Sequence, residues 1–124
     1  MKILLVEDSK AIASLEVQAV RHIFNEALQV VRALDGQTAV EKFKEETVDL
    51  ILLDWHLPEK SGIEVLKEIR AMDAQVPIIM ITSETALHSI NAAVKAGVSD
   101  YIIKPFNIQV LEEKIGRHLH ITKT

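Results

Sequence analysis

The chain has 124 residues, no cysteine and a formal net charge of −4. This length fits one domain with its own core, and the lack of cysteine excludes disulfides and cysteine metal sites. The basic residues form no stripe, so we expect no direct binding to nucleic acid or anionic lipid. No apolar stretch approaches the roughly 20 residues that span a bilayer, and the apolar run 3–6 is too short for a signal peptide. We therefore expect a cytoplasmic protein without a membrane segment.

Short apolar segments alternate along the chain with segments of helical periodicity. The expected strands are residues 3–6, 28–33, 50–53, 78–81 and 101–103. The first, third and fourth are almost wholly apolar, which is typical of strands covered on both faces. The second contains polar residues and is expected at an edge of the sheet.

Helices are expected between and after these strands. The first follows the N-cap Ser9, and its expected inward residues are Ile12, Leu15, Ala19, Ile23 and Phe24. The others are expected over residues 37–46, from the N-cap Ser61 onward, over residues 84–96, and after Pro105. Alternation of strand and helix indicates an α/β fold with a parallel sheet, and residues 1–124 are expected to form a single domain.

Polar residues follow four of the expected strands. Glu7 and Asp8 follow the first strand, Asp54 the third, Thr82 the fourth and Lys104 the fifth. Ligands bind outside the carboxyl ends of the strands in such sheets, where these ends meet at one edge. We therefore expect three carboxylates, the two hydroxyls of Thr82 and Ser83, and an ammonium group to converge there.

Clustered carboxylates repel one another, so they favour a bound cation. Mg²⁺ fits best, because it takes one or two carboxylates and fills its remaining positions with water and phosphate oxygens. Asp54 then keeps an oxygen for attack on a phosphoryl group, which would give an aspartyl phosphate. Lys104 would neutralise charge on the phosphoryl oxygens, and Thr82 could donate a hydrogen bond to one of them.

Five stretches carry a family resemblance: LLVEDS, ILLDWHLP, IIMITSE, AAVKAGVSDYIIKPF and LEEKI. They are spread from residue 4 to residue 115, so together they span nearly the whole chain. The sequence resembles the receiver domains of two-component response regulators, and most of all the CheY-type single-domain receivers of chemotaxis. The resemblance implies a (βα)5 doubly wound, five-stranded parallel sheet in the order 2-1-3-4-5.

The resemblance also implies roles for individual residues. Asp54 would be the phosphoacceptor, and Lys104 would contact the phosphoryl group. Mg²⁺ would be held by Asp8 directly, by Glu7 through water and by the backbone carbonyl of His56. Thr82 and Tyr101 would form the switch pair, and the Lys104–Pro105 peptide would be cis. Ser61 stands before Gly62 where the family usually has aspartate, which costs little because serine also caps helices.

The expected function is a phosphorylation-controlled binding module, not an enzyme with turnover. The donor would be a histidine kinase or phosphotransfer protein, and phosphorylation would change a face that binds a downstream protein. The chain would be a monomer or a weak, phosphorylation-dependent dimer. The expected face includes Ile90, Lys95, Tyr101, Ile103 and Lys114. His56 and Glu84 flank the expected site and are predicted to modulate hydrolysis of the acyl phosphate.

Three alternatives remain at this point. A phosphatase of the haloacid-dehalogenase type also uses a strand-end aspartate and Mg²⁺, but it needs a second aspartate where this chain has His56. A flavin-binding protein of flavodoxin type would need a loop rich in Ser, Thr and Gly where this chain has Glu7-Asp8-Ser9. The third alternative is a receiver cut from a longer transcriptional or enzymatic regulator. The five histidines show no metal-ligand spacing and are interpreted as surface or packing residues.

Overall fold

The computed structural model describes residues 1–24 and 28–119. The strands within these residues are β1 (Lys2–Val6), β2 (Gln29–Ala33), β3 (Leu50–Leu53), β4 (Ile78–Thr82) and β5 (Asp100–Ile103). The helices are α1 (Lys10–Ile23), α2 (Gly36–Glu45), α3 (Gly62–Met72), α4 (Leu87–Ala96) and α5 (Ile108–His118). Strand and helix alternate, as the sequence predicts.

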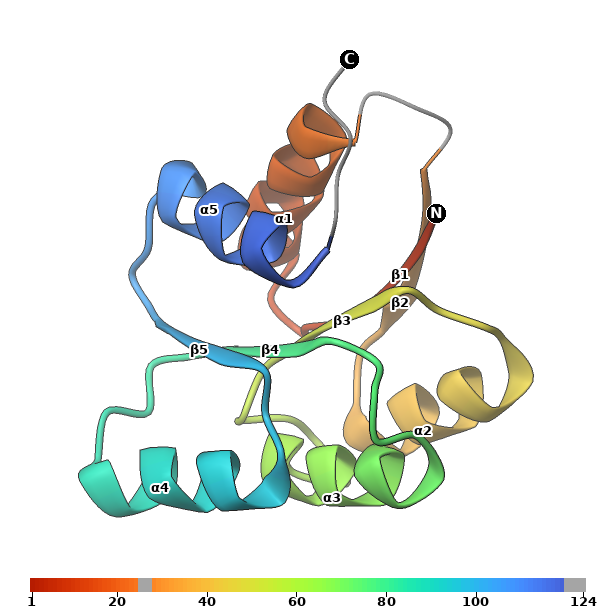
Figure 1. Cartoon of the computed structure of the whole chain (residues 1–124), viewed down its shortest axis with the longest axis vertical. Coiled ribbons are helices and arrows are strands. Elements are labelled where there is room, and N and C mark those ends of the chain that lie inside the picture. The colour runs from red at the N-terminus through yellow and green to blue at the C-terminus, as the bar shows by residue number, and fades with distance from the viewer. Residues whose placement is uncertain (25–27, 120–124) are drawn as a thin grey trace.

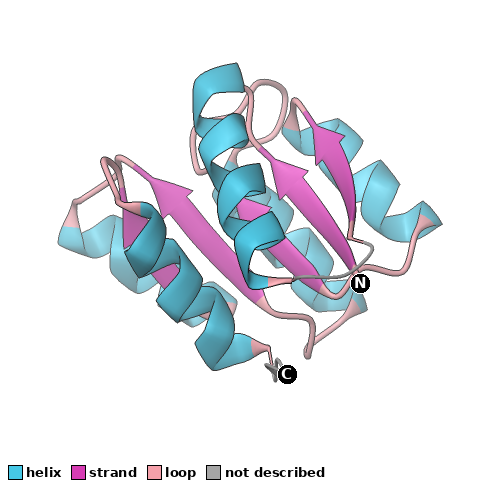
Figure 2. Cartoon of the chain, turned by 90° about the horizontal axis from the view of Figure 1, so that it is seen from above, coloured by secondary structure: helices cyan, strands magenta, loops and turns pink. Residues whose placement is uncertain are grey.

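The strands form one parallel sheet in the order β2-β1-β3-β4-β5. Helices α1 and α5 cover one face, and α2, α3 and α4 cover the other (Figure 1). Seen from above, the strands run in the same direction between the two helical layers (Figure 2). The predicted doubly wound α/β fold is confirmed, and β2 lies at an edge as expected.

Each face of the sheet has its own hydrophobic core, because alternate residues of a strand point to opposite faces. Leu4 and Val6 of β1 pack in the cluster with α2, α3 and α4, whereas Ile3 and Leu5 pack in the cluster with α1 and α5. Every residue of β3 and β4 is buried. Full burial of one such side chain stabilises the fold by about 1.5–3 kcal/mol, so the central strands hold the site's edge rigidly in place.

Helix α4 begins at Leu87, three residues after the predicted start at Glu84. The Glu84 backbone N–H donates to Thr82 Oγ1 (3.2 Å), and the Glu84 carboxylate accepts from the Ala86 N–H (3.3 Å). These local bonds stabilise a turn in competition with helix formation. Unlike the other four helices, α4 has no side-chain cap at its N-terminus.

The inward face of α1 also differs from the prediction. Leu15 is 38% exposed, whereas Glu16 is only 1% exposed. The buried stripe runs through Ala13, Glu16 and Val20 at spacings of three and four, so Leu15 falls beside it. Ser9 caps this helix as predicted, because its side chain accepts a hydrogen bond from the Ile12 N–H.

The Lys104–Pro105 peptide is cis, as the family resemblance implied. It follows β5 directly and so lies at the carboxyl edge of the sheet. Within the described part of the chain, each helix is too short or too polar to pass through a bilayer.

Candidate functional site

Three acidic side chains from two neighbouring strands meet at the carboxyl edge of the sheet. Glu7 and Asp8 follow β1, Asp54 follows β3, and the two strands pair directly. One carboxylate oxygen of each residue lies within 4.8 Å of those of the other two. Glu7 and Asp54 are buried, whereas Asp8 is exposed. The sheet topology thus brings together the three acids that the sequence singled out.

Lys104 joins the two buried acids. Its Nζ lies 3.0 Å from Glu7 Oε2 and 3.1 Å from Asp54 Oδ2. Burial, the largest influence, acts to lower the pKa of Lys104, but the hydrogen bonds and charges of Glu7 and Asp54 outweigh it and raise this pKa. Burial raises the pKa of Glu7, against the hydrogen bond from Lys104. The ammonium group is therefore held charged between its two partners.

The charges and donor atoms of this cluster fit a hard divalent cation. Three carboxylates and one ammonium group formally leave two negative charges uncompensated, and carboxylate oxygens are the protein ligands that Mg²⁺ prefers. Both oxygens of Glu7 already accept hydrogen bonds, from Lys104 Nζ and from the Ser9 N–H (3.1 Å). Both oxygens of Asp54 also accept hydrogen bonds, from Lys104 Nζ (3.1 Å) and from the His56 N–H (3.3 Å), so the exposed Asp8 is the acid most open to direct ligation.

The predicted switch residues, Thr82 and Tyr101, are linked through Glu84. The Thr82 side chain is fully buried, and its Oγ1 accepts from the Glu84 N–H (3.2 Å). The Tyr101 O–H donates to the Glu84 carbonyl (2.8 Å). Burial, aided by the charges of Glu84 and Asp54, raises the pKa of Tyr101 to about 12. One backbone segment between β4 and α4 thus connects the hydroxyl beside the acidic cluster with the ring on β5.

His56 and Glu84, the predicted rate-modulating residues, lie beside each other near Asp54. The His56 backbone N–H donates to Asp54 Oδ1 (3.3 Å). The His56 Nε2 lies 3.6 Å from Glu84 Oε2, and the histidine side chain is 59% exposed. The two loops that flank Asp54 therefore approach each other through these side chains.

A family model described as the response regulator receiver domain matches residues 3–116, which is most of the chain. The chain belongs to this family. The receiver is 37% identical over 120 residues to the chemotaxis protein CheY-3 of Vibrio cholerae, a match that covers 94% of this chain and 90% of that protein. It is also 37% identical to CheY1 of Helicobacter pylori, with 93% of this chain and 94% of that protein covered.

Solved receiver structures agree with this assignment. A CheY-like receiver domain from Methanospirillum hungatei superposes with a TM-score of 0.84 at 30% identity, over 94% of this chain and 90% of that one. Vibrio cholerae CheY4 superposes with a TM-score of 0.84 at 28% identity, over 95% and 98% of the two chains. The protein is therefore a two-component response regulator receiver, and nothing in these similarities favours the phosphatase alternative.

The residues of the expected partner face lie on α4, β5 and α5. Lys95 and Ile103 are exposed, and Ile90 is half-buried. Lys114 is not free, because its Nζ donates to Asp100 Oδ1 (3.0 Å) and to the Tyr101 carbonyl (3.3 Å). Two exposed apolar residues of α4 were not predicted, Leu87 (71% exposed) and Val94 (62% exposed). Leu87, Ile90 and Val94 stand at i, i+3 and i+7, and this helical spacing of apolar residues would have indicated them.

Two further residues near the acidic cluster were not predicted. Arg32 of β2 donates from Nε and Nη2 to the Glu7 carbonyl, at 3.2 and 3.1 Å. Burial, reinforced by the charge of Glu7, raises the pKa of Glu16 well above its usual range. In the sequence, Arg32 stands out only as a charged residue within a predicted strand. Glu16 stands out only because its position fits the helical spacing of the buried residues of α1.

Among the histidines that the structure describes, His56 lies at the rim of the acidic cluster and the others lie outside it. His22 contacts Glu112, His88 is exposed, and His118 Nε2 lies 3.1 Å from Asp100 Oδ2. His120 lies outside the described residues.

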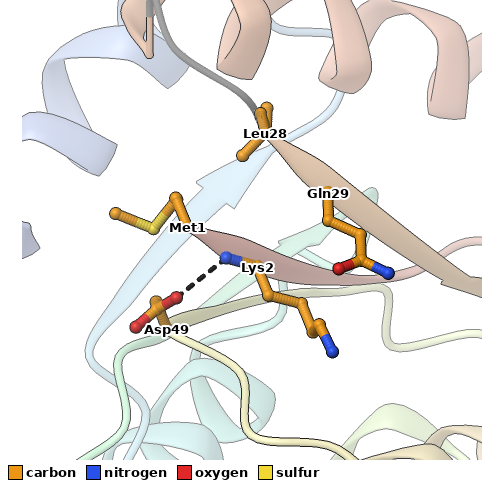
Figure 3. Close-up of a pocket in the computed structure, with 5 residues that line it drawn as sticks. All are labelled: Met1, Lys2, Leu28, Gln29 and Asp49. Carbon is orange, nitrogen blue, oxygen red and sulfur yellow. Dashed lines mark hydrogen bonds between the residues drawn. The ribbon is translucent and has the colours of Figure 1, made fainter.

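A shallow pocket at the opposite edge of the sheet is separate from this site (Figure 3). Met1, Lys2, Leu28, Gln29 and Asp49 line it. The Lys2 backbone N–H donates to Asp49 Oδ2 (2.8 Å) across it. Because the pocket lies at the amino ends of the strands, it has no part in the acidic cluster.

Proposed function

We propose that this receiver takes a phosphoryl group onto Asp54 from a histidine kinase or phosphotransfer protein and then alters a protein-binding face. The observation that carries the proposal is the placement of Lys104 Nζ between Asp54 and Glu7, with the Asp8 carboxylate beside them. A half-buried, charged lysine next to a strand-end carboxylate is suited to hold a transferring phosphoryl group.

In the transfer step, a carboxylate oxygen of Asp54 attacks phosphorus on the donor phosphohistidine. An O–P bond forms and the P–N bond breaks, and its electron pair stays on the imidazole nitrogen, which takes up a proton from solvent. The Lys104 ammonium group stabilises negative charge on the equatorial oxygens, while the His56 N–H on Asp54 Oδ1 holds the carboxylate in orientation.

A magnesium ion at this site would neutralise oxygens of the transferring group. Asp8, Asp54 and the backbone carbonyl of His56 are the proposed direct ligands, and Glu7 is proposed to act through water. The exposure of the Asp8 carboxylate beside the two buried acids supports its place as a direct ligand.

Phosphorylation then biases an existing equilibrium of the β4–α4 loop. If the Thr82 hydroxyl turns to a phosphoryl oxygen, it releases the Glu84 N–H, and the segment that holds the Tyr101 O–H changes with it. Helix α4 follows this segment without a side-chain cap, so its first turn is the part that moves most readily.

The proposed output face spans α4, β5 and α5 and binds a downstream protein. Ile90, Lys95 and Ile103 belong to it, together with the exposed apolar residues Leu87 and Val94. Tyr101 borders it, and Lys114 contributes its aliphatic stem while its ammonium group pairs with Asp100. Exposed apolar side chains beside a lysine suit an amphipathic protein surface.

His56 and Glu84 are proposed to set the lifetime of the phosphoryl group. Their side chains flank Asp54 from two loops, 3.6 Å apart, where they can order or exclude the attacking water.

The test is incubation with acetyl phosphate and Mg²⁺, followed by mass spectrometry of the intact protein. The native chain and Asp49→Asn, a control at the opposite edge of the sheet, should each gain one phosphoryl group. Asp54→Asn should gain none. An adduct on Asp54→Asn, or no adduct on the native chain, would refute the proposal.

A further inference from the structure

Arg32 makes a side-chain contact with the loop that carries the acidic cluster. It lies on the edge strand β2, opposite Leu5 of β1. Its Nε and Nη2 both donate to the Glu7 carbonyl oxygen, at 3.2 and 3.1 Å. Glu7 follows β1 directly, so this bond links the edge strand to the start of the acidic loop.

The contact extends strand pairing beyond the end of the ladder. The register of β1 with β2 ends at Val6 and Ala33, and the Glu7 N–H still donates to the Ala33 carbonyl (3.2 Å). The next backbone carbonyl after β1 is that of Glu7. On the other strand, the chain leaves β2 and enters α2 after the N-cap Asp35, so it no longer runs beside Glu7. The guanidinium group of Arg32, a side chain of β2, therefore donates to the Glu7 carbonyl in place of a backbone N–H.

With Arg32 in place, every polar group of Glu7 is bound. Its N–H donates to Ala33, its carbonyl accepts from Arg32, and its carboxylate oxygens accept from Ser9 and Lys104. Asp8 comes next in the chain and is the exposed acid of the cluster. The peptide unit that joins the two acids is thus held on its Glu7 side.

We propose that Arg32 is a positioning residue, which fixes the Glu7–Asp8 peptide and thereby aims the Asp8 carboxylate at a bound magnesium ion. This inference rests on the proposed magnesium site. Outer groups that orient metal ligands commonly change metal affinity by about 10–100-fold when removed. Because Arg32 acts through the backbone next to a ligand, we expect an effect near the lower end, about tenfold.

The charge of Arg32 opposes its geometric role, so the two effects can be distinguished by sign. A guanidinium group near a metal site repels the cation, so loss of its charge alone would tighten Mg²⁺ binding. Loss of a positioning bond would weaken it. Arg32→Gln removes both the paired guanidinium donors and the charge, whereas Arg32→Lys keeps the charge and one donor group.

The test is an MgCl₂ titration of the native protein, Arg32→Gln, Arg32→Lys and Arg117→Gln. Binding is measured by the fluorescence of Trp55, the only tryptophan, which directly follows Asp54, and by the Mg²⁺-induced rise in unfolding midpoint. Arg117→Gln is the matched control, because it makes the same charge change on α5, where Arg117 is exposed and pairs only with Glu113 among the described residues. Unfolding in EDTA shows whether each variant is folded.

We expect Arg32→Gln to bind Mg²⁺ about tenfold more weakly than Arg117→Gln, with Arg32→Lys intermediate. Equal or tighter binding by folded Arg32→Gln would overturn the inference while leaving the magnesium site intact. If the native protein shows neither response to MgCl₂, the proposed magnesium site fails and this inference fails with it.

Discussion

The acidic cluster should lower the stability of the metal-free protein, and Asp54→Asn tests this directly. The substitution keeps the size of the side chain and an oxygen that can accept from the His56 N–H, but it removes one buried negative charge. We expect the variant to be more stable than the native protein without Mg²⁺, although it has lost the proposed phosphoacceptor. Functional sites commonly carry such a cost.

The magnitude follows from the distances in the cluster. At an effective dielectric constant of about 20, Lys104 at 3.1 Å attracts the Asp54 charge by about 5 kcal/mol, and Glu7 within 4.8 Å repels it by at least about 3.5 kcal/mol. Asp8 is exposed, so its repulsion is screened and adds less. These terms nearly cancel, and desolvation of the buried carboxylate, which costs several kcal/mol per ion, decides the sign. We expect a gain of about 1–3 kcal/mol.

Urea and thermal unfolding in EDTA measure this difference. For a domain of this size, 1 kcal/mol corresponds to roughly 4 °C in Tm. Adding Mg²⁺ to 100 times its Kd should stabilise the native protein by about 2.7 kcal/mol and Asp54→Asn by less. The difference in stability between the two proteins should therefore shrink or change sign. A metal-free Asp54→Asn that is less stable than the native protein would refute the reasoning.

Three other predictions concern titration and lifetime. Burial raises the pKa of Glu16, so its neutral form stabilises the fold fully below about pH 4.5, and this contribution is lost as the pH rises through the folded-state pKa. Between pH 5 and pH 8, urea unfolding should therefore show a smaller fall in the free energy of unfolding for Glu16→Gln than for the native chain. Removal of either rim side chain, in His56→Ala or Glu84→Ala, should change the rate of phosphate release after the donor is withdrawn, and equal rates would rule out their role. Tyr101 is the only tyrosine, so the phenolate absorbance should titrate near pH 12, and a midpoint near 10 would show that the Tyr101 hydroxyl is not held beside Glu84.

Much of the site was predictable because it depends on chain order and strand pairing. Asp54 and Thr82 each end or follow a wholly apolar strand, and a parallel sheet places such ends together whatever the details of packing. The helix caps Ser9 and Ser61 were predictable for a similar reason, since each acts on its own helix within three residues.

The features that escaped prediction depend on side-chain reach and on exact helix rotation. The bond from Arg32 to Glu7 joins residues 25 positions apart, and it requires both the strand register and a long side chain. The burial of Glu16 in place of Leu15 depends on the rotation of α1 against the sheet, which the apolar pattern left one position uncertain. The late start of α4 follows from side-chain bonds of Thr82 and Glu84 that compete with the helix.

The most direct test of the site is to locate the phosphoryl group itself. After incubation with acetyl phosphate and Mg²⁺, borohydride reduces an aspartyl phosphate to homoserine, and peptide mass spectrometry identifies the position. We expect homoserine at position 54 in the native protein, with the yield strongly reduced in Lys104→Met, which removes the ammonium group from Asp54 and Glu7. Homoserine at another aspartate, or none at position 54, would contradict the assignment of this carboxylate as the phosphoacceptor.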